Sequence, residues 1–326
     1  MSKEKNDVVQ RVEGTCKTMC PRSEVCFRCS NGMVHILEKS RDSREEADAS
    51  KMVKEYARPA AGRDHLHPEC LRPPDVLVRT VRYLLKMYEH EKLARFGCVY
   101  SFVFDRLRAV RQDMILQDVS PLHTVRILQE MIPFYFDADY LCRTRSCDAY
   151  DEKLHSTSLE ECLSRWREAV PAVPKDVISP SIVCANILQR IPLPSALVDI
   201  YIWRDFLDHD LFNILREIVI AFRCNNYIRF FRKLLQLPVD NVVVAAVQAV
   251  ETLRYRALGT ISIAYKSPNV KIPIAVLANW LLYKDSCDLV DVLSCCSVIH
   301  ADSVVISSIN LNDLLGKDSF KLLAKF

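Results

Sequence analysis

Apolar side chains recur at helical spacing along most of the chain, and this pattern constrains the fold more than any other feature. Val103, Leu107, Val110 and Met114 follow one another at steps of four, three and four, which places them on one face of a helix. From residue 75 to about residue 256, such segments are separated by turns of only a few residues. Helices joined this tightly pack as antiparallel hairpins. The sequence therefore predicts a fold dominated by α-helices, with the hairpins stacked as an α-solenoid.

Composition indicates a soluble folded protein and removes several functional classes. Of the 326 residues, 50% are hydrophobic and 26% are charged, which is typical of a globular chain. No apolar run approaches the roughly 18 residues that span a bilayer, and the first residues lack the apolar segment of a secretory signal. With only six glycines, the chain has no glycine-rich phosphate loop. We expect a nuclear or cytosolic protein that uses no membrane and no small-molecule substrate.

The distribution of proline, charge and periodicity divides the chain into three zones. Residues 1–74 are polar and end in a proline-rich stretch, so we expect an extended arm with one short helix at Arg44–Ala57. Residues 75–256 form the helical body. Residues 257–326 continue a helix and then read as strand, helix, helix and two β-branched runs, the last two separated by an Ala301-Asp302-Ser303 turn. This order predicts a winged helix with a small β-hairpin.

Four cysteines lie within the stretch GTCKTMCPRSEVCFRC, and two explanations of them stay open. The zinc candidates are Cys16, Cys20, Cys26 and Cys29. Their spacing does not repeat the paired C-x2-C knuckles of a zinc ribbon, so we favour no metal at this position. In the alternative, small apolar side chains dock the arm onto the helical body, because reduced cysteine packs as a small hydrophobe. The docking candidates are Cys16, Met19, Cys20 and Pro21.

The sequence does not indicate catalytic chemistry. A nucleophilic cysteine needs a neighbouring base, and the spacing of His35, His65 and His67 resembles no such arrangement. We also recognise no paired carboxylates, no cluster of metal ligands and no phosphate-binding loop. We therefore predict no catalytic residues, no cofactor and no enzymatic activity.

Several blocks, taken in order, resemble the Sac-three/GANP homology family. The first is GTCKTMCP at Gly14–Pro21, which is similar to the family's GTCxxMCP signature. The next blocks are VKEYARPAAG, LRPPDVLVRTVRYLL, SFVFDRLRAVRQD, NNYIRFFRKL and RYRAL, and together they cover most of residues 12–266. The resemblance implies a solenoid of PCI-like or TPR-like hairpins that ends in a winged helix. It also implies pairing with a second PCI protein and a small acidic subunit, a nucleic-acid-binding platform, and no enzymatic activity.

The resemblance leaves two functions open. The larger relatives scaffold a transcription-coupled mRNA export complex, which implies a nuclear scaffold that binds RNA or DNA. The length of this chain is more similar to the small, centrosome-associated members. That similarity implies an adaptor at the centrosome or spindle that works in centrosome duplication and mitosis through protein contacts only. We expect nuclear and cytoplasmic localisation, with the centrosome or spindle as a further site.

Basic side chains are the candidates for contact with a phosphate backbone. They are Arg106, Arg108, Arg111, Arg229, Arg232, Lys233, Arg254 and Arg256. In one interpretation their stems run along the edge of the core and their charges pair with acidic neighbours in the chain. In the other, the later residues converge near the winged helix and bind RNA or DNA without sequence preference, because phosphate contacts carry no base information.

The segment SCDLVDVLSCC is a candidate protein-docking helix. It contains two aspartates and no lysine or arginine, which is poor chemistry for entering a DNA groove. Apolar helix faces and open strand edges are common docking surfaces, so we expect this helix and the hairpin to contact the PCI partner. The candidate residues are Leu289, Val290, Leu293, Val304 and Val305. The alternative is a terminal cap that closes the last core face of the solenoid.

Overall fold

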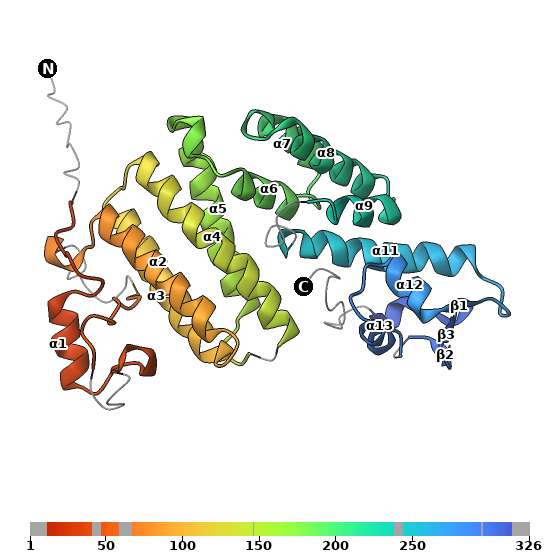
Figure 1. Ribbon diagram of the computed structural model, residues 1–326, viewed down its shortest axis with the longest axis horizontal. Helices are drawn as coiled ribbons and strands as arrows, with labels where there is room; N and C mark the ends of the chain where they lie inside the picture. Colours follow the sequence, from red (N-terminus) through yellow and green to blue (C-terminus); the bar gives the residue numbers. More distant parts are fainter. Residues whose placement is uncertain are drawn as a thin grey trace, which may run out of the picture. The chain divides into compact units, whose positions relative to one another are not determined.

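The computed structural model describes residues 12–40, 47–58, 67–145, 147–237, 244–294 and 296–314. The chain divides into two compact units, one from residues 1–135 and 147–177 and the other from residues 136–146 and 178–326. Both units are mainly helical, and the described strands all lie in the second (Figure 1). The predicted all-α-dominated architecture with a small β region near its end is therefore confirmed. None of the described helices is long and apolar enough to cross a membrane.

The first unit contains the arm and the first helices of the body. Its elements, in which η denotes a 3₁₀ helix, are α1 (Arg22–Ser30), η1 (Ile36–Glu38), η4 (Pro68–Cys70), α2 (Pro74–Glu91), α3 (Phe96–Leu116), the first part of α4 (Pro121–Thr144), α5 (Glu152–Ala169), η5 (Val170–Ala172) and η6 (Lys175–Val177). Helix α2 begins at Pro74, where the missing backbone donor costs nothing. It packs beside α3 (Figure 1). The predicted stripe of α3, from Val103 to Met114, is fully buried.

The arm differs from the prediction in the position of its helix. A helix at Arg44–Ala57 is wrong for residues 47–57, which form no helix, and residues 44–46 lie outside the described residues. The described helix of the arm is α1 instead. Backbone N–H groups in the second half of the predicted segment donate to carboxylates from other elements, which satisfies them without a helix. The pairs are Val53 with Glu38, Glu55 with Glu24, and Tyr56 with Asp105.

The second unit continues the helical body. After the last part of α4, its elements are α6 (Pro180–Gln189), α7 (Ala196–Ile202), η7 (Arg204–Phe206), α8 (His209–Arg223), α9 (Tyr227–Leu234), η8 (Val244–Ala246) and α11 (Val247–Ala264). The turn between α8 and α9 is tight because Asn225 adopts a φ of 51°, a conformation that asparagine tolerates. Asn226 then caps α9 by accepting a hydrogen bond from the Arg229 N–H at 3.0 Å. Helix α9 packs against both α8 and α11.

The C-terminal module consists of α11 and the residues that follow it as far as residue 314. Its further elements are β1 (Lys271–Pro273), α12 (Ile274–Trp280), α13 (Ser286–Leu293), β2 (Val298–His300), β3 (Ser303–Val305), η9 (Ile306–Ser308) and η10 (Leu311–Leu314). This order follows the predicted succession of helix, strand, helix, helix and hairpin. Strand β3 lies between the other two and is antiparallel to both, with Val304 opposite Ile272 and Ile299.

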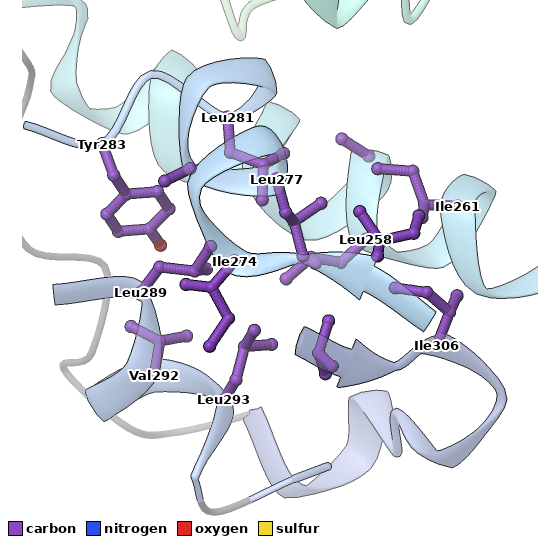
Figure 2. Packing of buried hydrophobic residues seen from close by; sticks show 14 of the residues in the cluster. Leu258, Ile261, Ile274, Leu277, Leu281, Tyr283, Leu289, Val292, Leu293 and Ile306 are labelled. Atoms are coloured by element: carbon purple, nitrogen blue, oxygen red, sulfur yellow. The ribbon is translucent and has the colours of Figure 1, made fainter. Parts of the chain in front are cut away.

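A single hydrophobic cluster holds the C-terminal module together. Figure 2 shows Leu258 and Ile261 of α11 facing Leu277 of α12, with Leu293 of α13 and Ile306 completing the cluster. Helix α11 therefore belongs to this core as well as to the helical body. The predicted boundary after residue 256 falls inside this helix, and the boundaries at residues 74 and 256 stay predictions.

Candidate nucleic-acid interface

The start of the arm lies in a narrow space beside α3. The Gly14 N–H donates to Gln117 Oε1 at 2.9 Å, and the Cys16 N–H donates to the Leu71 carbonyl at 3.0 Å. A Cβ on Gly14 would overlap that same carbonyl oxygen, so this close approach requires glycine. The docking candidates lie directly after it. Of the four, Cys16, Cys20 and Pro21 are buried and Met19 is half-buried.

The four cysteines of the zinc hypothesis have different environments. Cys16 and Cys20 are buried, whereas Cys26 and Cys29 are exposed on α1. Burial, assisted by the nearby Glu24 carboxylate, raises the pKa of the Cys20 thiol, which is the opposite of what nucleophilic attack requires. Within the described part of the chain, no group of three or more His, Cys, Asp or Glu side chains could hold a metal ion. The geometry therefore gives no support to a zinc site.

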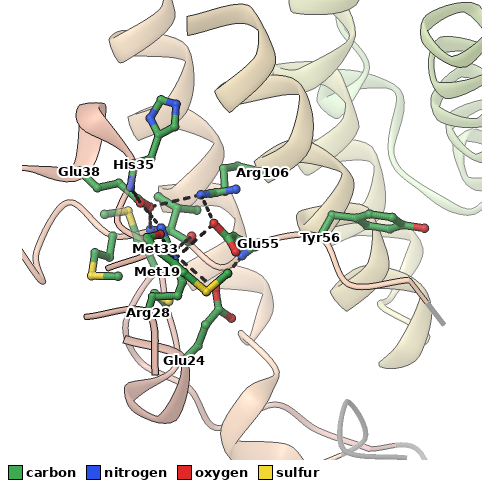
Figure 3. Close-up of polar contacts among 12 residues, drawn as sticks. Met19, Glu24, Arg28, Met33, His35, Glu38, Glu55, Tyr56 and Arg106 are labelled. Carbon is green, nitrogen blue, oxygen red and sulfur yellow. Dashed lines mark hydrogen bonds and ion pairs between the residues drawn. The ribbon is translucent and has the colours of Figure 1, made fainter. Parts of the chain in front are cut away.

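Arg28 of α1 is the centre of a buried ion-pair network. Its side chain is 1% exposed, pairs with Glu38 and lies 3.3 Å from Glu55. Its Nη1 also donates to the Val53 carbonyl at 3.1 Å. Arg106 of α3 contacts the same Glu55 carboxylate at 2.8 Å (Figure 3). Glu55 thus joins an arginine of the arm to an arginine of the helical body.

A second network joins the arm to the helical body through Asp113 of α3. Its two carboxylate oxygens lie 2.7 Å from Lys54 Nζ and 2.7 Å from Arg72 Nε. All three side chains are buried, and Lys54 Nζ also donates to the Cys70 carbonyl at 2.7 Å. Lys54, Arg72 and Asp113 come from three of the sequence blocks quoted above. The ion pairs of Asp113 thus bring these three blocks together in the fold.

The candidate arginines of α3 make contacts inside the first unit. Arg106 is only 4% exposed and lies in the Glu55 network, so its assignment to a nucleic-acid surface is corrected. Arg111 is largely covered and pairs with Glu161 of α5. Arg108 is half-buried, and its guanidinium lies 3.9 Å from the centre of the Tyr56 ring. For these residues the structure agrees with intramolecular pairing.

The candidates of α9 and Arg256 of α11 lie on two helices that pack against each other. Arg229, Arg232 and Lys233 lie at spacings of three and four residues and so share one side of α9. Arg229 and Arg232 are exposed, and Lys233 is half-buried. Arg256 of α11 is exposed and donates to the side chain of Asn225 at 2.9 Å. We call these four residues, together with Arg223, the basic face.

Arg223 is a member of the basic face that the sequence reasoning missed. The guanidinium carbons of Arg223 and Arg256 lie 5.9 and 5.5 Å from the centre of the same Phe222 ring. The sequence offered one signal for Arg223. It lies in the last turn of α8, where the helix dipole favours cations. Arg229 pairs with Glu217 of α8, so the face also includes an acidic side chain. The five named cations outweigh the Glu217 carboxylate, which gives this group of residues a net positive charge.

Arg254 has a structural role instead. It is 1% exposed, and its Nε donates to the Leu281 carbonyl at 2.8 Å while Nη2 donates to the Leu282 carbonyl. Its guanidinium carbon also lies 3.7 Å from the centre of the Tyr283 ring. These contacts satisfy carbonyls at the end of α12. The assignment of Arg254 to the nucleic-acid surface is therefore corrected.

The partner-binding candidates divide into buried and accessible residues. Leu289, Leu293 and Val304 are buried in the core of the C-terminal module, so a partner cannot contact them in this conformation, and their assignment is corrected. The sequence pattern shows an apolar side of α13, which we interpreted as a docking surface. In the structure that side faces the core of the module. Val290 and Val305 are half-buried. A further apolar residue, Val298 of the edge strand β2, is 49% exposed and was missed because a short strand edge has no periodic signal.

Comparison with known proteins identifies related sequences. The sequence model described as the SAC3/GANP family matches residues 19–302. SAC3 family protein B of Arabidopsis thaliana is 30% identical over 140 residues, which are 43% of this chain and 8% of the plant protein. Protein xmas of Drosophila melanogaster is 24% identical over 309 residues, which are 86% of this chain and 14% of the fly protein.

A fission yeast relative extends the comparison and shows a difference in size. SAC3 family protein 1 of Schizosaccharomyces pombe is 31% identical over 141 residues, which are 41% of this chain and 13% of the yeast protein. The chain thus spans between 8% and 14% of the length of these curated relatives.

Proposed function

Because the chain belongs to the SAC3/GANP family, we propose that it is a non-enzymatic scaffold subunit of nuclear mRNA export. In this role it pairs with a PCI protein and a small acidic subunit and holds RNA or DNA by the phosphate backbone. The C-terminal module serves as a winged helix in the pairing. Family membership supports the scaffold role, and the basic face supports the contact with nucleic acid.

The basic face is the observation that carries the proposal. Arg229 in the first turn of α9 and Arg256 of α11, which donates to Asn225, are both exposed beside the turn between α8 and α9. Exposed cations of this kind suit sequence-independent binding of a phosphate backbone. The face also adjoins the C-terminal module, because Tyr227 of α9 packs against the core of that module. A partner seated on the module would therefore lie next to the basic face.

The test is RNA binding by the complex of this chain with its PCI partner. A fluorescein-labelled 20-nucleotide RNA is titrated at several salt concentrations, and anisotropy gives Kd. We expect Arg229→Glu with Arg232→Glu to weaken binding at least tenfold. We also expect it to reduce the slope of log K against log salt by about 1.4, since each lost phosphate contact on a single strand contributes about 0.7.

The matched control is Arg82→Glu with Arg126→Glu, two exposed positions of the first unit. Arg82 pairs with Glu130 as Arg229 pairs with Glu217, so the control also breaks one surface ion pair. Equal loss of binding in both double variants, or binding that is insensitive to salt, would contradict the assignment of the basic face.

The pairing is tested by substitution on the accessible side of the module. Val298→Asp on β2 places a charge on an edge strand that is proposed to face the partner. We expect it to lower the recovery of purified PCI partner in a pulldown, whereas Leu93→Asp, at an 80% exposed position of the first unit, leaves recovery unchanged. Substitution of the buried Leu289 or Leu293 would unfold the module and would not report on pairing.

The second candidate function is an adaptor at the centrosome or spindle that makes protein contacts only. The observation in its favour is that Arg106, Arg111 and Arg254 all have partners inside the chain. This function predicts that centrosomal or spindle proteins are recovered equally with and without nuclease treatment. It also predicts that the Arg229→Glu, Arg232→Glu variant recovers them as well as the wild type does.

A further inference from the structure

Helix α7 and the turn that precedes it expose several large apolar side chains. Val198 and Ile202 are each 63% exposed, and Leu193, Leu197 and Tyr201 are between 41% and 56% exposed. We name these five residues the α7 ridge. Single exposed apolar residues are normal on a protein surface, but a contiguous group of them usually marks an interaction site.

The geometry of the α7 ridge follows from the helical repeat. Leu197 and Tyr201 are four residues apart, and so are Val198 and Ile202, so two parallel rows run along the exposed side of the helix. The opposite side is buried through Ala196 and Ile200. The segment is apolar on nearly all sides, which predicts burial, yet this chain covers only half of it. Side-chain rows with this spacing form ridges that fit into the grooves of a second helix.

Charged residues at the C-terminal end of the α7 ridge are mostly acidic. Asp205, Asp208 and Asp210 are exposed in the segment that joins α7 to the first turn of α8. This segment lies close to the ridge, because the rings of Tyr201 and Phe212 are 5.7 Å apart. The exposed cation in the same segment is Arg204, whose guanidinium carbon lies 5.5 Å from the centre of the Phe212 ring.

The balance of charge decides which occupant fits. Three exposed carboxylates against one guanidinium make this end of the ridge negative, whereas Arg190 near the other end pairs with Asp199 of α7. Two copies of this chain that met at the acidic end would bring like charges together. A partner with lysine or arginine beside its apolar residues would instead be attracted. The two rows of the ridge favour a helical partner over an extended one.

We propose that the α7 ridge binds an amphipathic helix of another protein, with an apolar stripe flanked by lysine and arginine. This surface is separate in composition from the basic face, which attracts anions. It therefore gives the chain a second partner of opposite charge preference. The inference does not depend on RNA binding or on pairing with a PCI protein.

The test uses the full chain and a defined probe. The probe is a labelled 18-residue helical peptide with leucine at positions i, i+3, i+4 and i+7 and lysine on both flanks of that stripe. Its control carries glutamate in place of every lysine. We expect the lysine peptide to bind the wild-type chain at micromolar concentration and the glutamate peptide to bind at least tenfold more weakly. Hydrogen exchange should show protection by the peptide at residues 193–202.

Substitutions locate the binding. Val198→Asp with Ile202→Asp should weaken the lysine peptide at least tenfold, and Asp205→Asn with Asp210→Asn about threefold. The matched control is Ile263→Asp, because Ile263 of α11 is 77% exposed outside the ridge. All positions are exposed, so the variants should fold, which circular dichroism and thermal melting check.

Four outcomes would overturn the proposal. They are no binding of the lysine peptide up to 500 µM, equal binding of the glutamate peptide, equal loss in Ile263→Asp, and a concentration-dependent dimer in sedimentation that Val198→Asp with Ile202→Asp abolishes. The last outcome would assign the ridge to a second copy of this chain. None of these results affects the RNA titration, so this proposal can fail while the proposed function stands.

Discussion

Asp113 offers the sharpest test of how the arm is held to the helical body. Its carboxylate lies 2.7 Å from both Lys54 Nζ and Arg72 Nε, and the exposed fractions of the three side chains are 0%, 4% and 0%. Asp113→Asn keeps the shape of the side chain but removes the charge that two buried cations share. Breaking a buried ion pair by removing one partner costs about 3–5 kcal/mol, because the remaining charge stays buried.

Urea unfolding, followed by tryptophan fluorescence and circular dichroism, measures this cost. With a slope of about 2 kcal/mol per molar, a loss of about 4 kcal/mol lowers the midpoint of the first unit by about 2 M. The arm of the variant should also be cleaved at trypsin concentrations that the wild-type arm resists. Lys54→Met combined with Asp113→Asn should recover part of the loss, since it removes one of the two uncompensated cations.

The comparison that decides the matter is Glu130→Gln. Glu130 pairs with Arg82 at the same distance of 2.7 Å, but these side chains are 33% and 66% exposed. A surface pair of this kind contributes about 0–1 kcal/mol. If Asp113→Asn and Glu130→Gln lower the free energy of unfolding by similar small amounts, the reasoning from burial is refuted.

Three further predictions concern the arm and the C-terminal module. Gly14→Ala should cost about 1–3 kcal/mol and speed proteolysis of the arm, because the new Cβ would overlap the Leu71 carbonyl oxygen. Burial, with the charge of Arg106, lowers the pKa of His35 below 6.5, so the folded state resists protonation. The free energy of unfolding should therefore fall as pH drops through 6.5, and His35→Gln should flatten this dependence in urea titrations at pH 5 to 8. Arg254→Met should lower the thermal stability of the C-terminal module by about 1–3 kcal/mol, seen by calorimetry, because it leaves two buried carbonyls unsatisfied.

Local patterns of the sequence predicted the elements well. The Val103 to Met114 stripe defined a helix whose apolar face is buried, because helical periodicity depends only on neighbours along the chain. The order of elements in the C-terminal module followed from the same kind of signal. The exposure of Arg229 and Arg232 opposite the apolar side of α9 was also readable from spacing.

Long-range contacts explain the predictions that were wrong. The segment around Glu55 is not helical because carboxylates from Glu24, Glu38 and Asp105 accept its backbone hydrogen bonds or those of its neighbours, and no pattern in the segment announces them. Leu289 is buried because the module's core lies against the apolar side of α13. A helical wheel shows that a side is apolar, but it does not say whether the chain itself covers that side.

The sequence by itself determined the family, the helical class and the order of the elements, because each depends on patterns and blocks that are local in the chain. Tertiary structure alone decided which charged and apolar residues stay accessible. Arg106 and Arg256 have the same chemistry, yet one is enclosed by Glu55 and the other is exposed beside Asn225. Val198 and Val304 are likewise both valine, and only packing leaves the first on the surface and places the second in a core. Accessibility depends on which distant segments pack together, and the free energy that selects this packing is summed over the whole fold.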